Sequence, residues 1–149
     1  MTSRNSIKAS TGYWVTRLAR TMERDFEKRL EPLGVTRGAY ALLSAIHQEN
    51  KTRPAELATF LGIDGAAVTR HLDRIEKRGL IKRKPNPRDR RATDIELTAE
   101  GRRVVLEGQA GSMATNAKFT AGLTETEVNQ FETVIRVMLA ETDAAISDV

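Results

Sequence analysis

Apolar residues three or four positions apart recur along much of the chain, and this spacing is typical of helices that bury one face. The first such stripe consists of Trp14, Leu18, Met22 and Phe26. It predicts a helix over residues 11–30, which Pro32 and Gly34 bring to an end.

Capping residues and shorter apolar stripes predict three more helices in the middle of the chain. The second begins after Thr36, and the third begins at Pro54, whose missing N–H is not needed in a first helical turn. The fourth lies between Asp64 and Gly79. The inner faces of the three helices are formed by Ala39, Leu42, Leu43 and Ile46, by Leu57, Ala58 and Leu61, and by Val68, Leu72 and Ile75.

Two further helices are predicted in the last third of the chain. The fifth begins after Thr98, and its segment 108–117 is rich in small residues, so its weak intrinsic helicity predicts close packing against a neighbour. The sixth begins at Thr124, which forms a capping box with Glu127. Its apolar stripe is Val128, Phe131, Ile135, Met138 and Leu139.

Between the fourth and fifth helices the pattern changes from helical spacing to alternation. Residues 80–84 and 92–97 alternate apolar and polar side chains, which predicts two strands of a hairpin. Pro85, Asn86, Pro87 and Asp89 predict the turn. The fold class expected is therefore mainly α, with six helices and a small β-hairpin.

The third and fourth helices have the pattern of a helix-turn-helix. This motif needs a small residue at the helix contact and a glycine at the turn, which Ala58 and Gly62 supply. With the hairpin that follows, the order is that of a winged helix-turn-helix, which places one helix in the major groove of DNA. Two ordinary core helices show a similar pattern, so both interpretations stay open at this point.

Charge is distributed unevenly along the chain, which carries a net charge of +4. Residues 70–91 contain ten Lys and Arg against three acids, a balance of +7, whereas residues 104–149 contain two against seven, a balance of −5. A basic patch on a motif that explains it indicates a face that binds a polyanion. The alternative is a merely solvated charged surface.

Two elements supply the residues expected to contact double-stranded DNA. The fourth helix presents small residues at its N-terminus and cations farther along, and the wing presents cations whose arginines suit a narrow minor groove. We expect Asp89 to orient a wing guanidinium. Arg70 could bind either a base or a phosphate, Arg74 could instead pair with an acid such as Glu76, and His71 is expected to pack as a neutral imidazole. The predicted DNA-binding residues are Gly65, Ala66, Ala67, Thr69, Arg70, Arg74, Lys82, Arg83, Arg88, Arg90 and Arg91.

Composition excludes several classes of site. The chain has no cysteine, which excludes disulfides, thiolate metal ligands and cysteine redox sensing. Two histidines are too few for a convincing metal cage, although a carboxylate-rich site is not ruled out. We find no nucleophile–base pair and no phosphate-binding glycine loop, so we expect neither an enzyme nor a cofactor. No apolar run spans a bilayer and no signal peptide is recognised, so we expect a cytoplasmic protein without a membrane partner.

The phrases AELATFLGI, VTRHLDRIEKRGLIKR and DRRATDIELTAEG resemble the MarR family of bacterial transcriptional regulators over nearly the whole chain. The most specific positions are Asp89, Arg91, Leu97, Thr98 and Gly101. The resemblance implies a dimer of six-helix winged subunits that reads DNA through residues 65–74 and through Arg91 in the minor groove. It also implies a repressor that a small phenolic ligand releases from DNA.

The two apolar stripes near the termini independently favour a homodimer, because one DNA-reading unit cannot bury both of them. We therefore expect a single domain, residues 1–149, with dimerisation helices at about 11–33 and 98–147 and the winged helix-turn-helix at about 36–97. A two-fold protein predicts a palindromic operator. Packing of the two stripes within one chain is the alternative.

An effector pocket is predicted where aromatic residues accompany an arginine, a combination that suits an aromatic carboxylate. The candidates are Tyr13, Trp14, Arg17, Tyr40 and His47. The aromatic residues could instead belong to the core. Two other functions also stay open: an architectural protein that binds DNA without sequence preference, and a winged-helix module that binds RNA or protein. The absence of aromatics within the basic patch argues against RNA.

Overall fold

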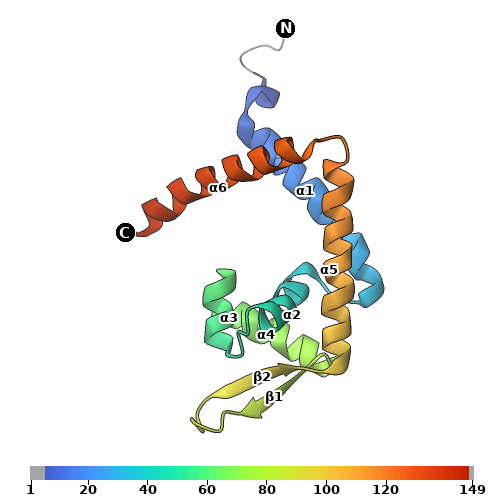
Figure 1. Cartoon of the computed structure of the whole chain (residues 1–149). Coiled ribbons are helices and arrows are strands. Elements are labelled where there is room, and N and C mark those ends of the chain that lie inside the picture. The colour runs from blue at the N-terminus through green and yellow to red at the C-terminus, as the bar shows by residue number, and fades with distance from the viewer. Residues whose placement is uncertain (1–5, 148–149) are drawn as a thin grey trace. The chain divides into compact units, whose positions relative to one another are not determined.

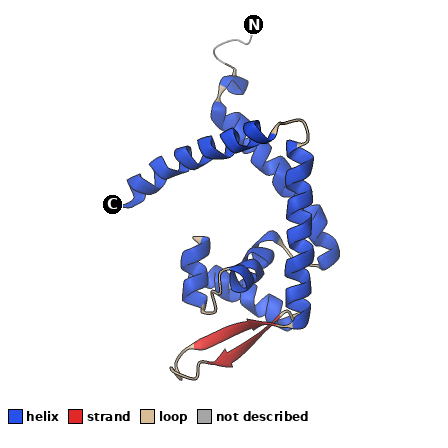
Figure 2. Ribbon diagram, in the orientation of Figure 1, coloured by secondary structure: helices blue, strands red, loops and turns tan. Residues whose placement is uncertain are grey.

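The structure is a computed structural model that describes residues 6–147, with side chains described to residue 140. Its elements, in chain order, are a short 3₁₀ turn η1 (Ile7–Ala9), helix α1 (Thr11–Leu30), turn η2 (Glu31–Leu33), helices α2 (Arg37–Gln48), α3 (Pro54–Leu61) and α4 (Gly65–Lys77), strands β1 (Ile81–Pro85) and β2 (Thr93–Leu97), and helices α5 (Ala99–Thr120) and α6 (Glu125–Ser147) (Figures 1 and 2). The six helices and the hairpin confirm the predicted fold class.

The chain divides into two compact units after Thr115. The first unit contains α1 to α4, the hairpin and most of α5, and the second contains the end of α5 and all of α6.

The helix ends of the first unit form as their capping residues predict. The Thr36 hydroxyl accepts a hydrogen bond from the Ala39 backbone N–H at 3.2 Å, and the Asp64 carboxylate accepts one from Ala67 N–H at 2.8 Å. Gly62, which ends α3, has φ of +63°, in the left-handed region that favours glycine. The turn between α3 and α4 is therefore the one that the sequence predicts.

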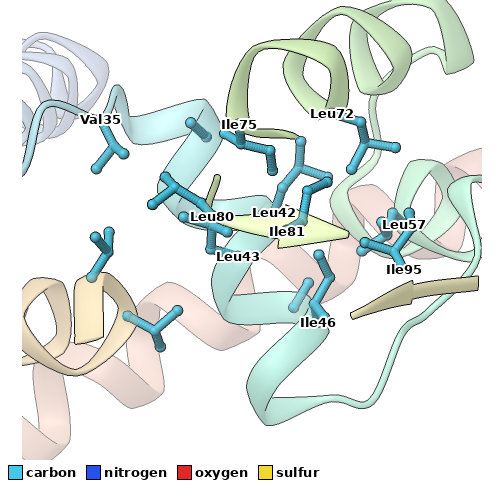
Figure 3. Close-up of a cluster of buried hydrophobic side chains, with 14 of the residues drawn as sticks. Val35, Leu42, Leu43, Ile46, Leu57, Leu72, Ile75, Leu80, Ile81 and Ile95 are labelled. Carbon is cyan, nitrogen blue, oxygen red and sulfur yellow. The ribbon is translucent and has the colours of Figure 1, made fainter. Parts of the chain in front are cut away.

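The core of the first unit lies where α2, α3 and α4 meet the base of the hairpin. Figure 3 shows the side chains of α2 and α4 converging on the two strands. The largest fully buried side chains are Leu30, Leu42, Leu43, Leu57, Leu72, Ile75, Ile81, Ile95, Val68, Val104 and Val105. The apolar stripes predicted for α2, α3 and α4 supply many of them, so these stripes face the core.

The hairpin pairs antiparallel, with Arg83 opposite Ile95. Both strands differ from their predicted bounds by one residue, because Pro85 and Thr93 form the last pair. The proline occupies a strand end at an exposed edge, where its missing N–H costs no ladder hydrogen bond. Ile95 N–H also donates to the Thr52 carbonyl at 2.8 Å, which fixes β2 against the connector before α3.

Glycines bring α5 into very close contact with the rest of the first unit. A Cβ atom built on Gly101 would lie 2.0 Å from the Leu80 carbonyl oxygen, and one on Gly108 would lie 2.3 Å from the Tyr40 ring. The Thr98 hydroxyl accepts from Gly101 N–H at 3.0 Å and donates to the Gly79 carbonyl at 2.6 Å. The prediction that the small residues of α5 serve close packing is confirmed at Gly108.

The second unit confirms the predicted capping box at the start of α6. The Glu127 carboxylate accepts hydrogen bonds from Thr124 backbone N–H at 2.8 Å and from the Thr124 hydroxyl at 2.9 Å. The backbone bond is the main reason why the pKa of Glu127 lies below its usual value. Helix α6 exposes large apolar side chains, among them Phe131, Val134, Val137 and Leu139.

Candidate nucleic-acid interface

The outer face of α4 combines small residues with unpaired cations. Gly65, Ala66, Thr69 and Arg70 are exposed, and Ala67 is half-buried. The Thr69 hydroxyl donates to the Gly65 carbonyl at 3.0 Å, which leaves its oxygen free to accept a hydrogen bond. A nearly flat helix surface of this kind permits close approach of the backbone to a groove floor.

The cations of this face are free of carboxylates. Arg70 and Arg74 are exposed, and among residues 6–140 neither side chain forms an ion pair. The alternative of an Arg74 ion pair with Glu76 is thus not formed, because the Glu76 carboxylate contacts another arginine. Both guanidinium groups are available to a phosphate or a base.

His71 packs against the inner layer rather than facing outward. It is half-buried, and a Cβ atom on Gly38 would lie 2.8 Å from its Cε1 atom. The close approach of α2 to α4 therefore needs a glycine at position 38, a requirement that the sequence pattern alone did not show.

Asn86 organises the tip of the wing. Asn86 is only 8% exposed, and its side-chain amide donates to Asp94 Oδ2 at 2.8 Å. Its side-chain oxygen accepts from the backbone N–H groups of Arg88 and Asp89 at 2.8 and 3.0 Å. The sequence identified this residue only as a turn former. Its fourfold bonding, which includes its own N–H donating to the Ala92 carbonyl, shows that it holds the loop of cations in shape.

Asp89 acts on the same loop through backbone rather than through a guanidinium. Its Oδ1 atom accepts from Arg91 backbone N–H at 2.9 Å. The predicted contact between Asp89 and a wing guanidinium is therefore not formed. The tight turn instead brings the backbone N–H of the residue two positions later within reach of the carboxylate. Asp89 still orients the wing tip at Arg91.

The hairpin carries exposed cations both on β1 and at the wing tip. Lys82, Arg88, Arg90 and Arg91 are exposed, and within residues 6–140 their side chains form no ion pair. Arg83 differs from them, because Asp73 and Glu76 of α4 bind its guanidinium at 2.7 and 2.8 Å. The structure therefore leaves most of the predicted DNA-binding cations exposed and unpaired, whereas Arg83 is paired with acids of α4.

The five predicted effector residues do not share one cavity. A cleft of about 730 Å³ lies along α1 and includes Tyr13 and Arg17. The Arg17 guanidinium lies 5.7 Å from the centre of the Trp14 ring, and its Nη1 atom donates to the Tyr13 hydroxyl at 3.4 Å. Trp14 itself is 52% exposed.

The other two candidates lie on α2, away from this cleft. Tyr40 packs edge-on against Phe26 at 5.2 Å and fills the space above Gly108, so it is a packing residue. His47 is exposed and lines a separate, smaller hollow of about 250 Å³ near β2. From the sequence we grouped the five effector candidates by residue type. Residue type does not determine which helix faces lie against each other.

The acids of the α1 cleft are already paired. Glu23 and Glu27 bind the Arg37 guanidinium at 2.7 and 3.1 Å, and the hydrogen bond that Arg37 donates to Glu23 is the main reason why the pKa of Arg37 is raised. Arg17, which lies along the same helix, has no carboxylate partner among the described residues. The cleft is therefore suited to an anion.

The described residues contain neither a metal-binding cluster nor a membrane-spanning helix. No group of three or more His, Cys, Asp and Glu side chains lies close enough to hold a metal ion. Each helix in this part of the chain is too short or too polar to span a lipid bilayer.

Comparisons with known proteins agree with this geometry. The model of the MarR family matches residues 35–93, which include α2 to α4 and most of the hairpin. A mutant MarR from E. coli complexed with operator DNA is 29% identical, with 86% of this chain and 92% of that chain covered and a TM-score of 0.77. CouR from Rhodococcus jostii RHA1 bound to p-coumaroyl-CoA is 27% identical, with 90% and 94% covered and a TM-score of 0.77. YusO from Bacillus subtilis is 29% identical, with 93% and 98% covered and a TM-score of 0.69.

Proposed function

We propose that this chain, which belongs to the MarR family, is a sequence-specific DNA-binding transcriptional regulator that acts as a homodimer. The observation that carries the proposal is the set of exposed cations on α4 and the hairpin that have no carboxylate partner among the described residues. The relative from E. coli that is complexed with operator DNA supports it. The proposal assigns no catalytic activity to the chain.

In this proposal each DNA-facing element has its own role. Helix α4 enters the major groove with its small N-terminal residues against the groove floor, so that Thr69 and Arg70 reach base edges and Arg74 reaches a phosphate. The wing tip follows the backbone and places Arg91 in the adjacent minor groove, whose narrow parts concentrate negative potential. Lys82, Arg88 and Arg90 contribute further phosphate contacts.

The dimer is inferred from apolar surface that one chain leaves in water. Trp14 and Val15 on α1 are 52% and 40% exposed, and Val134 and Val137 on α6 are 55% and 59% exposed. Apolar exposure on this scale marks an interface. We assign dimerisation to residues 11–33 and 98–147 and DNA reading to residues 36–97, with a second copy of the chain as the partner.

We expect the protein to prefer one palindromic sequence over random DNA. Duplexes selected from a random library by the wild-type protein should contain an inverted repeat with half-sites about 10 bp apart, because two copies of α4 read one face of the duplex. A labelled selected duplex should resist a large excess of random duplex.

Footprinting and sedimentation equilibrium provide the controls for this experiment. The footprint should be two-fold symmetric, and the protein should sediment at twice 16.6 kDa. Equal competition by random and selected DNA would indicate an architectural protein instead, and a monomer that binds an asymmetric half-site would contradict the dimer.

We further propose that the protein is a repressor released from DNA by an aromatic anion, and that the α1 cleft binds this effector. Arg17 would bind a carboxylate or phosphate group, and Tyr13 would contact the aromatic ring. Trp14 does not line the cleft and would instead pack against Arg17 and Tyr13. The relative bound to p-coumaroyl-CoA supports an effector of this general kind. Tyr40 and His47 have no place in this site, because the structure puts them outside the cleft.

We expect Arg17→Ala to weaken the affinity for p-coumaroyl-CoA or p-coumarate by roughly ten- to a hundredfold, because a charge-assisted hydrogen bond contributes about 1.5–3 kcal/mol. The measurement is calorimetry on the free protein, followed by release of the selected duplex. His47→Gln, outside the cleft, is the matched control and should bind as the wild type does. The reverse result, with His47 needed and Arg17 dispensable, would place the effector elsewhere.

A further inference from the structure

One arginine of the wing forms ion pairs with acids of α4. Arg83, in the middle of β1, binds Asp73 Oδ1 through Nη2 at 2.7 Å and Glu76 Oε2 through Nη1 at 2.8 Å. The two carboxylates lie three positions apart on α4, so they are neighbours on one helix face. We call these three residues the wing latch.

The wing latch contributes little to the stability of the fold. The side chains of Arg83, Asp73 and Glu76 are 30%, 59% and 36% exposed. Ion pairs so open to water contribute about 0–1 kcal/mol each, because solvent screens them. The repulsion that it adds to DNA binding is larger than this stabilisation, because its two carboxylates lie on a helix that meets phosphates.

The position of the wing latch suggests a different purpose. Within residues 6–140 it supplies the ion pairs recorded between α4 and the hairpin. On one side of Arg83, the buried Ile81 anchors β1 in the core, and on the other side the strand continues to the exposed cations of the tip. The latch therefore holds the hairpin where its core contacts end.

We propose that Arg83 is a positioning residue that fixes the wing at one angle to α4, so that the two elements enter adjacent grooves together. This proposal rests on the proposed function and replaces the direct DNA contact expected of Arg83. Its guanidinium fits the task because a planar fork can bind two carboxylates at once. Asp73 and Glu76 are then part of the DNA-reading machinery although they carry the charge of DNA itself.

The sign of the effect of removing the acids distinguishes positioning from contact. If Arg83 contacts phosphate, the variant that combines Asp73→Asn and Glu76→Gln removes repulsion and binds the selected duplex more tightly. If the wing latch positions the hairpin, the same variant binds more weakly, by about fivefold, because two surface ion pairs are lost in each subunit. Electrostatic repulsion alone cannot give that result.

The experiment compares five proteins on the duplex that the wild type selects. They are the wild type, Arg83→Ala, Arg83→Lys, the Asp73→Asn and Glu76→Gln double variant, and Glu96→Gln. Glu96→Gln is the matched control, because it removes a hairpin carboxylate that binds Lys84 and not α4, and it should bind as tightly as the wild type or more tightly. Arg83→Lys should recover only part of the affinity, since one ammonium group cannot bind both acids as a fork does.

A second readout needs no DNA. Hydrogen exchange of the hairpin amides in the free protein should accelerate in Arg83→Ala and in the double variant, and not in Glu96→Gln. Tighter binding by the double variant, or full recovery by Arg83→Lys, would overturn the wing latch. A wild-type protein that selects no duplex would instead contradict the proposed function, while the exchange rates would still test the latch.

Discussion

Replacing Gly101 with alanine is expected to lower the free energy of unfolding by about 3 kcal/mol, at the upper end of what overpacking costs. The added Cβ atom would lie 2.0 Å from the Leu80 carbonyl oxygen and 3.0 Å from its carbon. The carbonyl cannot easily move aside, because Thr98 N–H donates to it at 3.0 Å. The gain in helix propensity from glycine to alanine, about 1 kcal/mol, is too small to offset this clash.

Thermal unfolding checks this prediction directly. A loss of about 3 kcal/mol lowers Tm by roughly 6–12 °C in a chain of this size. Gly122→Ala is the matched control, because a Cβ atom there meets no atom within 4 Å and its Tm should stay close to that of the wild type. Equal Tm values for the two variants would show that α5 and the hairpin base can separate at little cost.

The second large effect is expected when the two DNA-reading arginines are removed one at a time. Arg91→Ala should weaken binding to many sequences, because a minor-groove arginine senses shape and charge rather than base identity. With one cation lost from each subunit, the slope of log K against log salt should become shallower by roughly 2. Arg70→Ala should cost on the order of 1–3 kcal/mol per half-site, concentrated at one operator position, if Arg70 reads a base.

A salt titration of each variant on the selected duplex and on its single-base variants separates these effects. Arg136→Ala provides the control, since it removes an equal charge from α6, where Arg136 binds Glu132. Its slope should match the wild type. An unchanged slope for Arg91→Ala would remove the wing tip from the contact surface, and a uniform loss for Arg70→Ala would make Arg70 a phosphate contact.

The sequence predicted the helices of this chain well because the signals that define them are local. Thr36, Asp64 and Thr124 cap helices within three residues of themselves, and Gly62 has the positive φ that its place in the pattern requires. The strand bounds differed by one residue at both ends of β1 and at the start of β2.

Features that depend on distant residues could not be predicted in this way. The need for glycine at position 101 comes from a carbonyl 21 positions earlier in the chain, at Leu80. The role of Arg83 depends on acids of the preceding helix, and a pattern of cations cannot show which of them is already paired. The five effector candidates were separated for the same reason, because residue type does not fix the facing of helices.

Direct hydrogen bonds join the start of α5 to the base of the wing at a junction of four residues, which are Gly79, Leu80, Thr98 and Gly101. From Ala99 to Thr115 the helix is a stiff rod about 24 Å long. If this helix tilts about the junction by about 5°, its far end moves by about 2 Å. A small displacement of the far end of α5 is therefore coupled to a small rotation of the wing. A ligand could thus change how the two grooves are matched without touching any residue that meets DNA.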